Sequence, residues 1–256
     1  MSNKKLIAVT RPHERSQIAK DIIEENGGEM FLASTIDIEL MKTESLDYLY
    51  SVLGKLDWII ITSPATIKSL FYYYPDFNEK IGCNTKIAVI GSKTGECLEE
   101  HGLSADLIPD NYTAEGLISE FEKMDVNGSL IGIPRTLQAR KILPESLENL
   151  GAEVIVAEAY KSVIPKDTSC IDELISAVFS NKIDAITFTS PLTVHNLFKV
   201  LDNEKKEDFI QELSNNVLTV AIGPITGNTL REYGIKYINP EKYTVKDMLK
   251  ITFDNL

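Results

Sequence analysis

The chain has 256 residues, of which 43% are hydrophobic and 25% are charged, a composition typical of a folded globular protein of about two domains. Its 26 lysines and arginines are outnumbered by 38 aspartates and glutamates, which gives a net charge of −12. A protein that binds nucleic acid without sequence preference needs a basic surface to replace the phosphate counterions, so this balance argues against that function.

Neither a signal peptide nor a membrane-spanning segment is predicted. The first apolar run, residues 6–9, is short and is followed at once by a polar turn, and no later run reaches the roughly 18 residues that a membrane span requires. The three cysteines, Cys83, Cys97 and Cys170, are odd in number and far apart, which favours free thiols and a cytoplasmic protein. Neither the cysteines nor the histidines have the spacing of zinc ligands, so no metal site is expected.

Short apolar runs rich in β-branched residues recur along the chain, and each is followed by a segment with helical spacing. Six of these runs are predicted strands: 6–9, 57–61, 86–90, 129–133, 184–188 and 218–222. Apolar strands that alternate with helices are typical of a parallel sheet covered on both faces. The predicted fold class is therefore α/β, with doubly wound parallel sheets.

The two halves of the chain, about 1–126 and 127–256, repeat each other. The matching pairs are, in chain order, Arg11 with Arg135, Glu29 with Glu153, 57–71 with 184–198, 87–103 with 219–235, and Tyr112-Thr113 with Tyr243-Thr244. Such a repeat predicts that both halves share one plan of alternating strands and helices.

The second strand of each half is predicted to be unusually long. Residues 29–40 and 153–164 each give 12 residues of strand-like sequence, about twice the usual length. Two tandem domains would be the simplest arrangement, but a strand of that length can finish in one sheet and continue as a connector toward another. We therefore favour interleaved domains: residues 1–35 with 165–256, residues 41–158, and a two-stranded linker of residues 36–40 and 159–164.

Hydroxyls, glycines and arginines, but no acidic side chains, occupy the turns that follow the predicted strands. These turns are Thr10-Arg11-Pro12, Thr62-Ser63-Pro64, Gly91-Ser92-Lys93-Thr94, Pro134-Arg135-Thr136, Thr189-Ser190-Pro191 and Gly223-Pro224-Ile225-Thr226. In doubly wound sheets ligands bind beyond the carboxyl ends of the strands, where helix amino termini attract anions. The turns therefore predict a set of anion sites. Serine before proline is also a common helix start, so Ser63 and Ser190 are equally well explained as ordinary caps.

Several other chemistries lack their sequence patterns. A phosphate-binding loop ending at Lys93-Thr94 would need glycine at positions that hold Ser92 and Ile87. No GxSxG pattern makes Ser63 or Ser190 a nucleophile, and no GxGxxG pattern follows a strand to bind a dinucleotide.

A series of motifs occurs in one order along essentially the whole chain. They are the opening Thr-Arg-Pro, the duplicated Ser-Pro turns, the duplicated Ile-Gly-x-x-Thr turns, and R-x-x-L-P-x-x-L-x-x-L-G-A-x-V at 140–154 with the following Tyr160. Together they resemble the uroporphyrinogen-III synthase family. The motifs of that family are diffuse, so the resemblance rests on the order and number of the matches.

The resemblance implies both a fold and a reaction. The fold is two α/β domains, the first discontinuous, joined by a two-stranded ladder, with the active site in the cleft. The reaction is that of a cyclising lyase in tetrapyrrole and heme biosynthesis: it closes hydroxymethylbilane with inversion of the last pyrrole ring and loss of water, and it needs no metal or organic cofactor. The substrate carries eight carboxylates, which hydroxyls, helix amino termini and arginines could hold.

The resemblance also implies site residues. The family's cleft positions fall on Ser63, Thr94, Tyr160, Ser190 and Thr226. Tyr160 is the expected catalytic residue, which assists departure of the substrate hydroxyl, although a tyrosine on a crossing strand can equally be a packing residue of the hinge. The anion-site turns add Thr10, Arg11 and Arg135 to the expected substrate-binding residues.

One position departs from the family pattern. Many relatives have a basic residue shortly after the first Thr-Ser-Pro, and this chain has Ala65. The substrate carboxylate that such a side chain would meet could be met instead by Lys68, by Lys93 or by water.

Two other classes of function stay open. One is a non-enzymatic, two-lobed sensor that binds an anion or a tetrapyrrole, since such sheets also occur in binding proteins. The other is a glycosyltransferase with two facing α/β domains, against which the lack of an acidic metal-binding pair and of a glycine-rich nucleotide loop weighs. For the favoured function we expect a monomer that acts on a small molecule, with no nucleic-acid or membrane partner.

Overall fold

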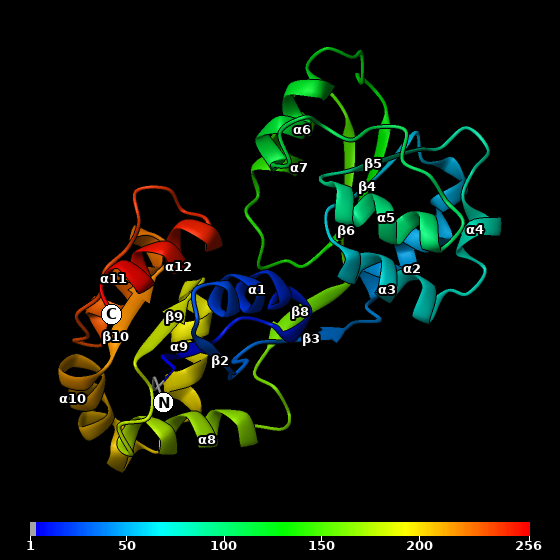
Figure 1. Cartoon of the computed structure of the whole chain (residues 1–256). Helices are drawn as coiled ribbons and strands as arrows, with labels where there is room; N and C mark the ends of the chain where they lie inside the picture. Colours follow the sequence, from blue (N-terminus) through cyan, green and yellow to red (C-terminus); the bar gives the residue numbers. More distant parts are fainter. Residues whose placement is uncertain (1–3) are drawn as a thin grey trace. The chain divides into compact units, whose positions relative to one another are not determined.

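The computed structural model describes residues 4–256, which form two compact units (Figure 1). Unit 1 runs to Asp37 and resumes at Val163, and unit 2 comprises Ile38–Ser162. Each unit contains a four-stranded parallel sheet, with the strand order β10-β9-β1-β2 in unit 1 and β5-β4-β6-β7 in unit 2. The predicted α/β class with parallel sheets is confirmed.

The predicted strands all appear within two residues of their expected ends. The elements of unit 1 are β1 (Leu6–Val9), α1 (Gln17–Glu25), β2 (Glu29–Leu32), α8 (Ser169–Phe179), β9 (Ala185–Phe188), α9 (Pro191–Val200), α10 (Lys206–Asn216), β10 (Leu218–Ala221), α11 (Pro224–Glu232) and α12 (Val245–Asp254). The elements of unit 2 are α2 (Glu44–Ser51), β4 (Trp58–Ile61), α3 (Pro64–Tyr73), α4 (Phe77–Lys80), β5 (Lys86–Val89), α5 (Ser92–Glu100), α6 (Ala114–Phe121), β6 (Leu130–Arg135), α7 (Ile142–Asn149) and β7 (Glu153–Glu158). Short 3-10 turns occur at His13–Arg15, Leu53–Lys55 and Asn203–Lys205.

Two further strands lie where the chain passes from one unit to the other. They are β3 (Asp37–Leu40) and β8 (Tyr160–Val163), and they pair with each other in a separate two-stranded sheet. Both strands lie within the ranges predicted for the linker, residues 36–40 and 159–164.

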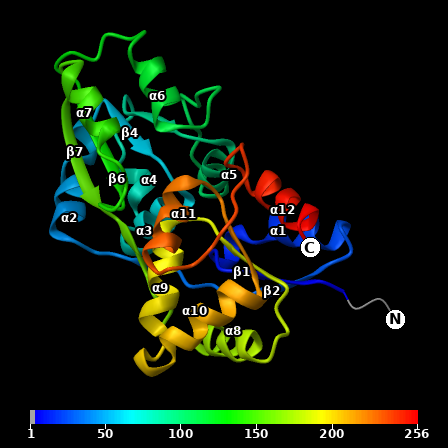
Figure 2. The ribbon, with the colours of Figure 1, turned by 90° about the vertical axis from the view of Figure 1, so that its left-hand side faces the viewer.

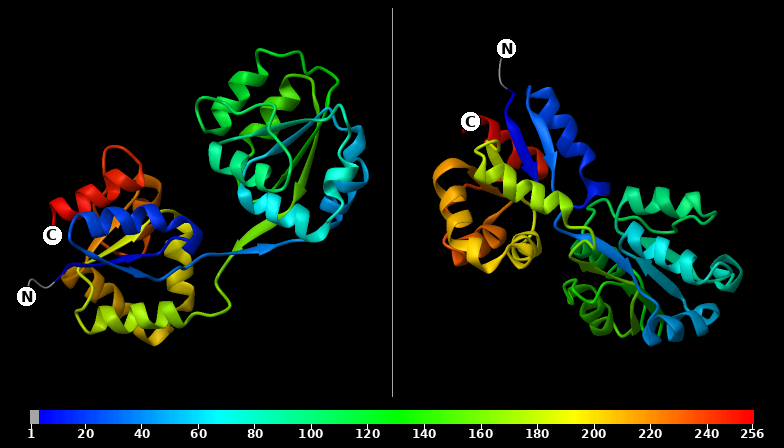
Figure 3. Two further views of the ribbon diagram at one scale, coloured as in Figure 1. Left: turned by 45° about the vertical axis from the view of Figure 1, so that its right-hand side comes forward. Right: turned by 90° about the horizontal axis from the view of Figure 1, so that it is seen from below.

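Each half of the chain contributes two strands to each sheet. Figure 3 accordingly shows colours from both halves of the sequence in each unit. Unit 1 combines β1 and β2 from the first half with β9 and β10 from the second, and unit 2 combines β4 and β5 with β6 and β7. In the sequence repeat β1 corresponds to β6, β2 to β7, β4 to β9 and β5 to β10, so the two sheets have the same order. The repeated segment and the compact unit are therefore different pieces of the chain.

The prediction of two uninterrupted 12-residue strands is wrong in detail. β2 ends at Leu32 and β3 begins only at Asp37, while the single residue Ala159 separates β7 from β8. Between β2 and β3 two side-chain bonds hold Thr35: its hydroxyl donates to the carbonyl oxygen of Thr193 at 3.0 Å, and its own carbonyl accepts the side-chain amide of Asn196 at 2.8 Å. The connectors are thus held by contacts with distant parts of the chain, which strand propensity does not reveal.

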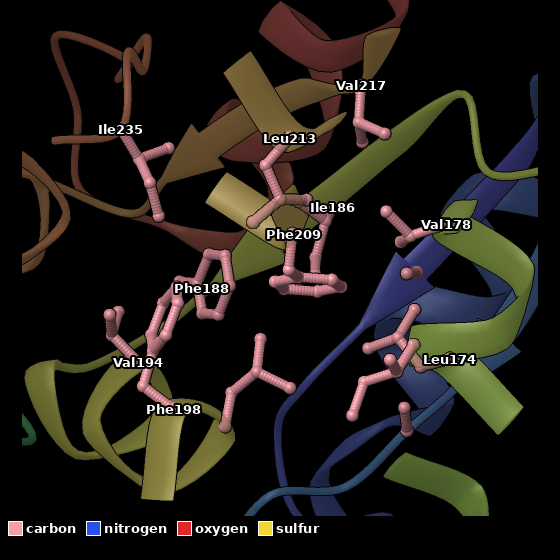
Figure 4. Packing of buried hydrophobic residues seen from close by; sticks show 14 of the residues in the cluster. Leu174, Val178, Ile186, Phe188, Val194, Phe198, Phe209, Leu213, Val217 and Ile235 are labelled. Atoms are coloured by element: carbon pink, nitrogen blue, oxygen red, sulfur yellow. The ribbon is translucent and has the colours of Figure 1, made fainter. Parts of the chain in front are cut away.

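Apolar side chains alternate between the two faces of each sheet, as covered parallel sheets require. In unit 1, Ile186 and Phe188 pack in the cluster beneath α8, α9 and α10 (Figure 4). On the other face, Ile7 and Val9 pack toward α1 and α12, which lie side by side in Figure 2. In unit 2 the clusters pack α2, α3 and α5 on one face and α6 and α7 on the other. Each sheet is therefore buried on both faces, and its strand ends are left to carry polar residues.

Candidate functional site

The carboxyl ends of the strands bring the predicted site residues into one row in each unit. In unit 2, following the sheet from β5 to β7, the row is Thr94, Ser63, Arg135 and Tyr160. In unit 1, following the sheet from β10 to β2, the row is Thr226, Ser190, Thr10-Arg11 and Ile36. Because all strands of a parallel sheet end at the same edge, residues far apart in the chain become neighbours there.

The two serines of the Ser-Pro turns cap helices. Ser63 Oγ accepts the N–H of Ala65 at 3.2 Å, and Ser190 Oγ accepts the N–H of Thr193 at 3.3 Å as part of a capping box. Their interpretation as ordinary helix caps is confirmed. A hydroxyl that accepts an N–H still has its own proton to donate, and no described residue accepts it here. Both serines therefore keep one donor for a ligand.

The helices α5 and α11 begin without a side-chain cap. Their N-cap residues are Gly91 and Gly223, so the first N–H groups of each helix have no side-chain acceptor. Thr94 and Thr226 follow in the first turn and are only 5% and 3% exposed. Neither hydroxyl hydrogen-bonds to a residue of the described chain. Neither hydroxyl is enclosed, so both reach solvent. Each helix start can thus offer N–H groups, the positive end of the helix dipole and one hydroxyl to an anion.

The hydroxyl of Thr10 points into unit 1. Its side chain is fully buried and donates to the carbonyl oxygen of Thr187 at 2.9 Å, and Thr187 in turn donates to the carbonyl of Ala8 at 3.1 Å. These bonds join the ends of β1 and β9. The hydroxyl proton of Thr10 is therefore already donated within the unit. Substrate binding by Thr10 stays a prediction, which rests on the position of Thr10 at the edge of the sheet.

Arg135 is buried at the end of β6 and supports the loop that follows. Its Nε donates to the carbonyl of Thr136 at 3.2 Å and its Nη2 to the carbonyl of Arg140 at 2.8 Å. Arg140 forms two bonds to the carboxylate of Glu115, at 2.6 and 3.1 Å. Burial lowers the pKa of the Arg135 guanidinium, and no carboxylate within residues 4–256 forms an ion pair with it. Arg135 therefore brings an unpaired positive charge to the strand end.

Arg11 occupies the equivalent position in unit 1 with fewer partners. Its side chain is half-buried, and its Nε is enclosed without a hydrogen-bond partner among the described residues. Burial lowers the pKa of the Arg11 guanidinium, and the positive charge of Arg15 lowers it further. An enclosed guanidinium N–H with no acceptor is unfavourable, so Arg11 is a candidate for binding a carboxylate.

Tyr160 follows β7 with its ring buried and its hydroxyl open. The residue is 8% exposed and belongs to the apolar cluster that packs α3 against the sheet. The preceding residue is fixed, because the carbonyl of Ala159 accepts the hydroxyl of Ser69 at 2.6 Å. The phenol hydroxyl hydrogen-bonds to no described residue and is not enclosed, so it reaches solvent. Tyr160 also interacts electrostatically with the Arg135 guanidinium.

Ala65 occupies the position where many relatives have a basic residue. Ala65 is buried in the first turn of α3, where its N–H donates to the Ser63 cap. Lys68 and Lys93 are exposed, and neither forms an ion pair with another described residue. Either lysine remains able to meet a carboxylate.

Two residues at the strand ends were missed by the sequence reasoning. Tyr112 and Tyr243 are exposed and lie against Gly91 and Gly223, the caps of α5 and α11. The repeat contains both as a Tyr-Thr pair, which was the available signal, but a repeat does not say where a ring points.

Residues 4–256 bring no three His, Cys, Asp or Glu side chains together in a group that could hold a metal ion. No helix in this range has the length and apolar character needed to cross a membrane. The strand ends carry hydroxyls, N–H groups and guanidiniums, which are groups that can bind anions. The fold defines the class of protein: α/β proteins of two units, each built on a parallel sheet.

Comparison with known proteins gives the family. The family model for "Uroporphyrinogen-III synthase HemD" matches residues 16–250. A protein of Methanothermobacter thermautotrophicus, whose name gives uroporphyrinogen-III synthase as a provisional assignment, is 46% identical over 95% of each chain. The uroporphyrinogen-III synthase of Chlorobaculum parvum is 27% identical over 93% of this chain and 94% of its own. The chain belongs to the uroporphyrinogen-III synthase family, a family of cyclising lyases in tetrapyrrole biosynthesis.

A solved structure supports the fold. The crystal structure of uroporphyrinogen-III synthetase from Helicobacter pylori matches with a TM-score of 0.64, at 15% sequence identity, over 98% of this chain and 100% of that chain. At this identity the likeness concerns the fold. It agrees with the α/β class and the parallel sheets described above.

Proposed function

We propose that this chain closes hydroxymethylbilane to uroporphyrinogen III, with inversion of the last pyrrole ring and release of water. In this reaction the carbon–oxygen bond of the hydroxymethyl group breaks and the oxygen leaves as water after taking up one proton. The former hydroxymethyl carbon bonds to the substituted α carbon of the last pyrrole ring, which gives the spirocyclic intermediate proposed for the family. The bond from this α carbon to its original methylene bridge then breaks, and the bridge carbon bonds to the free α carbon of the same ring, which releases a proton. Membership of the family supports the reaction, and the donors at the strand ends support binding of a substrate with eight carboxylates.

The observation that carries the proposal for the site is the environment of Tyr160. Its ring is buried, whereas its hydroxyl reaches solvent and has no partner in the described chain. A residue that only packs needs the ring but not an accessible, unpaired phenol. We propose that this phenol donates the proton to the leaving hydroxyl.

We further propose that the remaining strand-end donors hold the substrate carboxylates. The set comprises Thr10, Arg11, Ser63, Thr94, Arg135, Ser190 and Thr226. Protein and substrate are both negatively charged, so attraction at long range does not assist binding. Binding therefore depends on short-range donors, and we expect added salt to weaken it less than it weakens an electrostatically steered encounter.

The test is the isomer formed when hydroxymethylbilane is supplied to the purified chain. Spontaneous closure gives the uninverted isomer, so uroporphyrinogen III above the buffer control is the expected result. Heat-inactivated protein provides the matched control. A product that contains only the uninverted isomer, formed at the spontaneous rate, would contradict the proposal and favour the non-enzymatic sensor.

We also propose that the protein acts in the cytoplasm as a monomer. The cysteines of the described chain are all free, which suits a reducing compartment. Size-exclusion chromatography with light scattering tests the monomer, and a mass near twice that of one chain would contradict it.

A further inference from the structure

In unit 2 an exposed tyrosine lies against the start of α5. Tyr112 is 58% exposed, and a methyl group placed on Gly91 would lie 3.5 Å from its Cγ atom. Gly91 is the N-cap of α5 and brings no side chain of its own. The base of the ring thus covers the cap, while the rest of the ring stands in solvent beside the first turn of the helix.

Unit 1 has the same arrangement at the start of α11. Tyr243 is 60% exposed, and a methyl group placed on Gly223 would lie only 3.0 Å from its Cδ1 atom. Gly223 is the N-cap of α11, again without a side-chain cap. Glycine at this position allows the close approach of the ring. A single exposed tyrosine needs no explanation, but the same pair at equivalent places in both units does.

Both tyrosines are held on anchored segments. The next residue in each case, Thr113 or Thr244, caps the following helix by accepting a backbone N–H at 3.0 or 3.1 Å. A few residues earlier, the carbonyls of Leu107 and Ile238 each accept an N–H from the edge strand of their sheet, both at 2.9 Å. The backbone on either side of each ring is therefore fixed, which reduces the entropy lost when a ligand contacts it.

The same helix starts also carry an unpaired hydroxyl. Thr94 and Thr226 are at least 95% buried, make no side-chain hydrogen bond with the described chain, and have hydroxyls that reach solvent at the first turn. Each unit thus presents a hydroxyl, free N–H groups and an exposed aromatic face within one helix start. A ligand that suits all three carries an anionic group next to a flat ring.

We propose that Tyr112 and Tyr243 bind substrate, each by packing its ring against a pyrrole ring whose carboxylate is held at the adjacent helix start. This inference rests on the proposed function, because a pyrrole ring with acidic side chains is the repeating element of hydroxymethylbilane. Aromatic rings attract each other in stacked and edge-on arrangements beyond the effect of buried area. The contact is made by the ring rather than by the phenol hydroxyl.

The experiment replaces each tyrosine by alanine and by phenylalanine. We expect Tyr112→Ala and Tyr243→Ala each to raise the KM for hydroxymethylbilane about threefold to tenfold, with kcat changed less than about twofold. Phenylalanine should restore the KM because it keeps the ring. Tyr48→Ala is the matched control, since Tyr48 is 56% exposed on α2 and is not among the strand-end residues. Thermal melts exclude loss of folding as the cause.

A second measurement separates this inference from the proposed reaction. Titration with uroporphyrin III, the oxidised macrocycle with the same eight carboxylates, measures binding without turnover. If the wild-type chain binds the porphyrin but forms no type III isomer, the proposed reaction fails while weaker binding by the alanine variants still supports the tyrosine contacts. Alanine variants with wild-type KM and wild-type porphyrin affinity would overturn the inference. A wild-type chain that neither reacts nor binds would overturn both.

Discussion

The two units carry the same row of strand ends and differ at two places in it. Ser63 and Ser190 both cap helices, and the helix starts that follow β5 and β10 match in their glycine, threonine and tyrosine. The first difference is the arginine: Arg135 is bonded to the loop after it, whereas Arg11 has an enclosed N–H without a partner. The second follows the edge strand, where unit 2 has Tyr160 and unit 1 has Ile36.

In the proposed function, the features common to both units bind the substrate, and a feature of unit 2 alone takes part in the reaction. The features that attract anions occur in both units, as expected if a substrate with many carboxylates is held at several places. The proposed proton donor, Tyr160, has no counterpart in unit 1, where Ile36 occupies the equivalent position. In the proposed function the duplication provides the repeated groups that bind carboxylates, and catalysis depends on the difference between the two units.

The largest effect is expected on folding, when a fragment is defined by the sequence repeat instead of by a compact unit. A fragment of residues 41–158 keeps all four strands of the unit 2 sheet and should unfold cooperatively. A fragment of residues 1–126 keeps only two strands of each sheet and should not fold. Circular dichroism melts check both, and a cooperative transition of fragment 1–126 would show that the repeat, not the unit, is the folding element.

The next largest effect is expected on activity, when the hydroxyl of Tyr160, which has no counterpart in unit 1, is removed. Tyr160→Phe keeps the ring and removes the hydroxyl, so activity should fall at least about tenfold, the conservative side of the contribution of general acid catalysis. Stability and product affinity should change little. Tyr73→Phe is the control, because its hydroxyl donates to the carbonyl of Leu40 at 3.1 Å within unit 2. Full activity of Tyr160→Phe would leave Tyr160 a packing role and move the proton donor to Thr94, Thr226 or a water.

The same substitution should have different effects at the two arginines: a loss of stability at Arg135 and a higher KM at Arg11. Arg135→Met removes two charge-assisted bonds from a buried loop and should destabilise the protein by about 2 kcal/mol or more. Arg11→Met removes an enclosed N–H that has no acceptor, so stability should stay the same or rise, while the KM for hydroxymethylbilane should rise about tenfold if Arg11 binds a carboxylate. Urea denaturation and steady-state kinetics check both, and a loss of stability confined to Arg11→Met would reverse the comparison.

The two threonines should respond alike. Thr94→Val and Thr226→Val remove only a hydroxyl donor, and each should raise the KM about threefold to tenfold. Thr219→Val is the matched control, since the Thr219 hydroxyl is enclosed in unit 1 without a partner and its removal should leave the KM unchanged. An effect at one threonine only would mean that a single unit holds the carboxylates.

The strands and the residues at their ends could be predicted from sequence, because apolar runs and the repeat locate them without knowledge of tertiary contacts. The direction of each side chain could not. Thr10 and Thr94 are both threonines beyond a strand, yet Thr10 donates inward to Thr187 and Thr94 keeps a free hydroxyl. That choice depends on the neighbouring strand, which lies more than 170 residues away in the case of Thr10.

The same limit explains the interrupted strands and the missed tyrosines. The segment before β3 is held by bonds from Thr35 to Thr193 and from Asn196 to Thr35, and Tyr243 lies close to Gly223. Propensity and repeat matching treat such residues one at a time or in local windows. Contacts across the fold decide them, so sequence reasoning found the row of strand ends but not its full membership.

A final contrast between the units concerns their tyrosines. In unit 2, Tyr50 donates to the carboxylate of Asp76 at 2.5 Å and Tyr74 donates to that of Asp47 at 2.8 Å. The bond to Asp76 raises the pKa of Tyr50 to about 12, and burial followed by the bond to Asp47 raises the pKa of Tyr74. In unit 1, Tyr233 pairs instead with a ring nitrogen of His195.

This contrast predicts a loss of stability in alkali that originates in unit 2. A phenol whose folded pKa exceeds the unfolded value of about 10 contributes stability fully below that pH and loses it as the pH rises toward 12. The wild-type melting temperature should therefore fall more steeply between pH 10 and 12 than that of the double variant Tyr50→Phe/Tyr74→Phe, which has no such phenols to ionise. The single tryptophan, Trp58, lies in β4 and makes fluorescence a probe of unit 2. Parallel curves for the two proteins would show that these tyrosine–aspartate pairs contribute no pH-dependent stability.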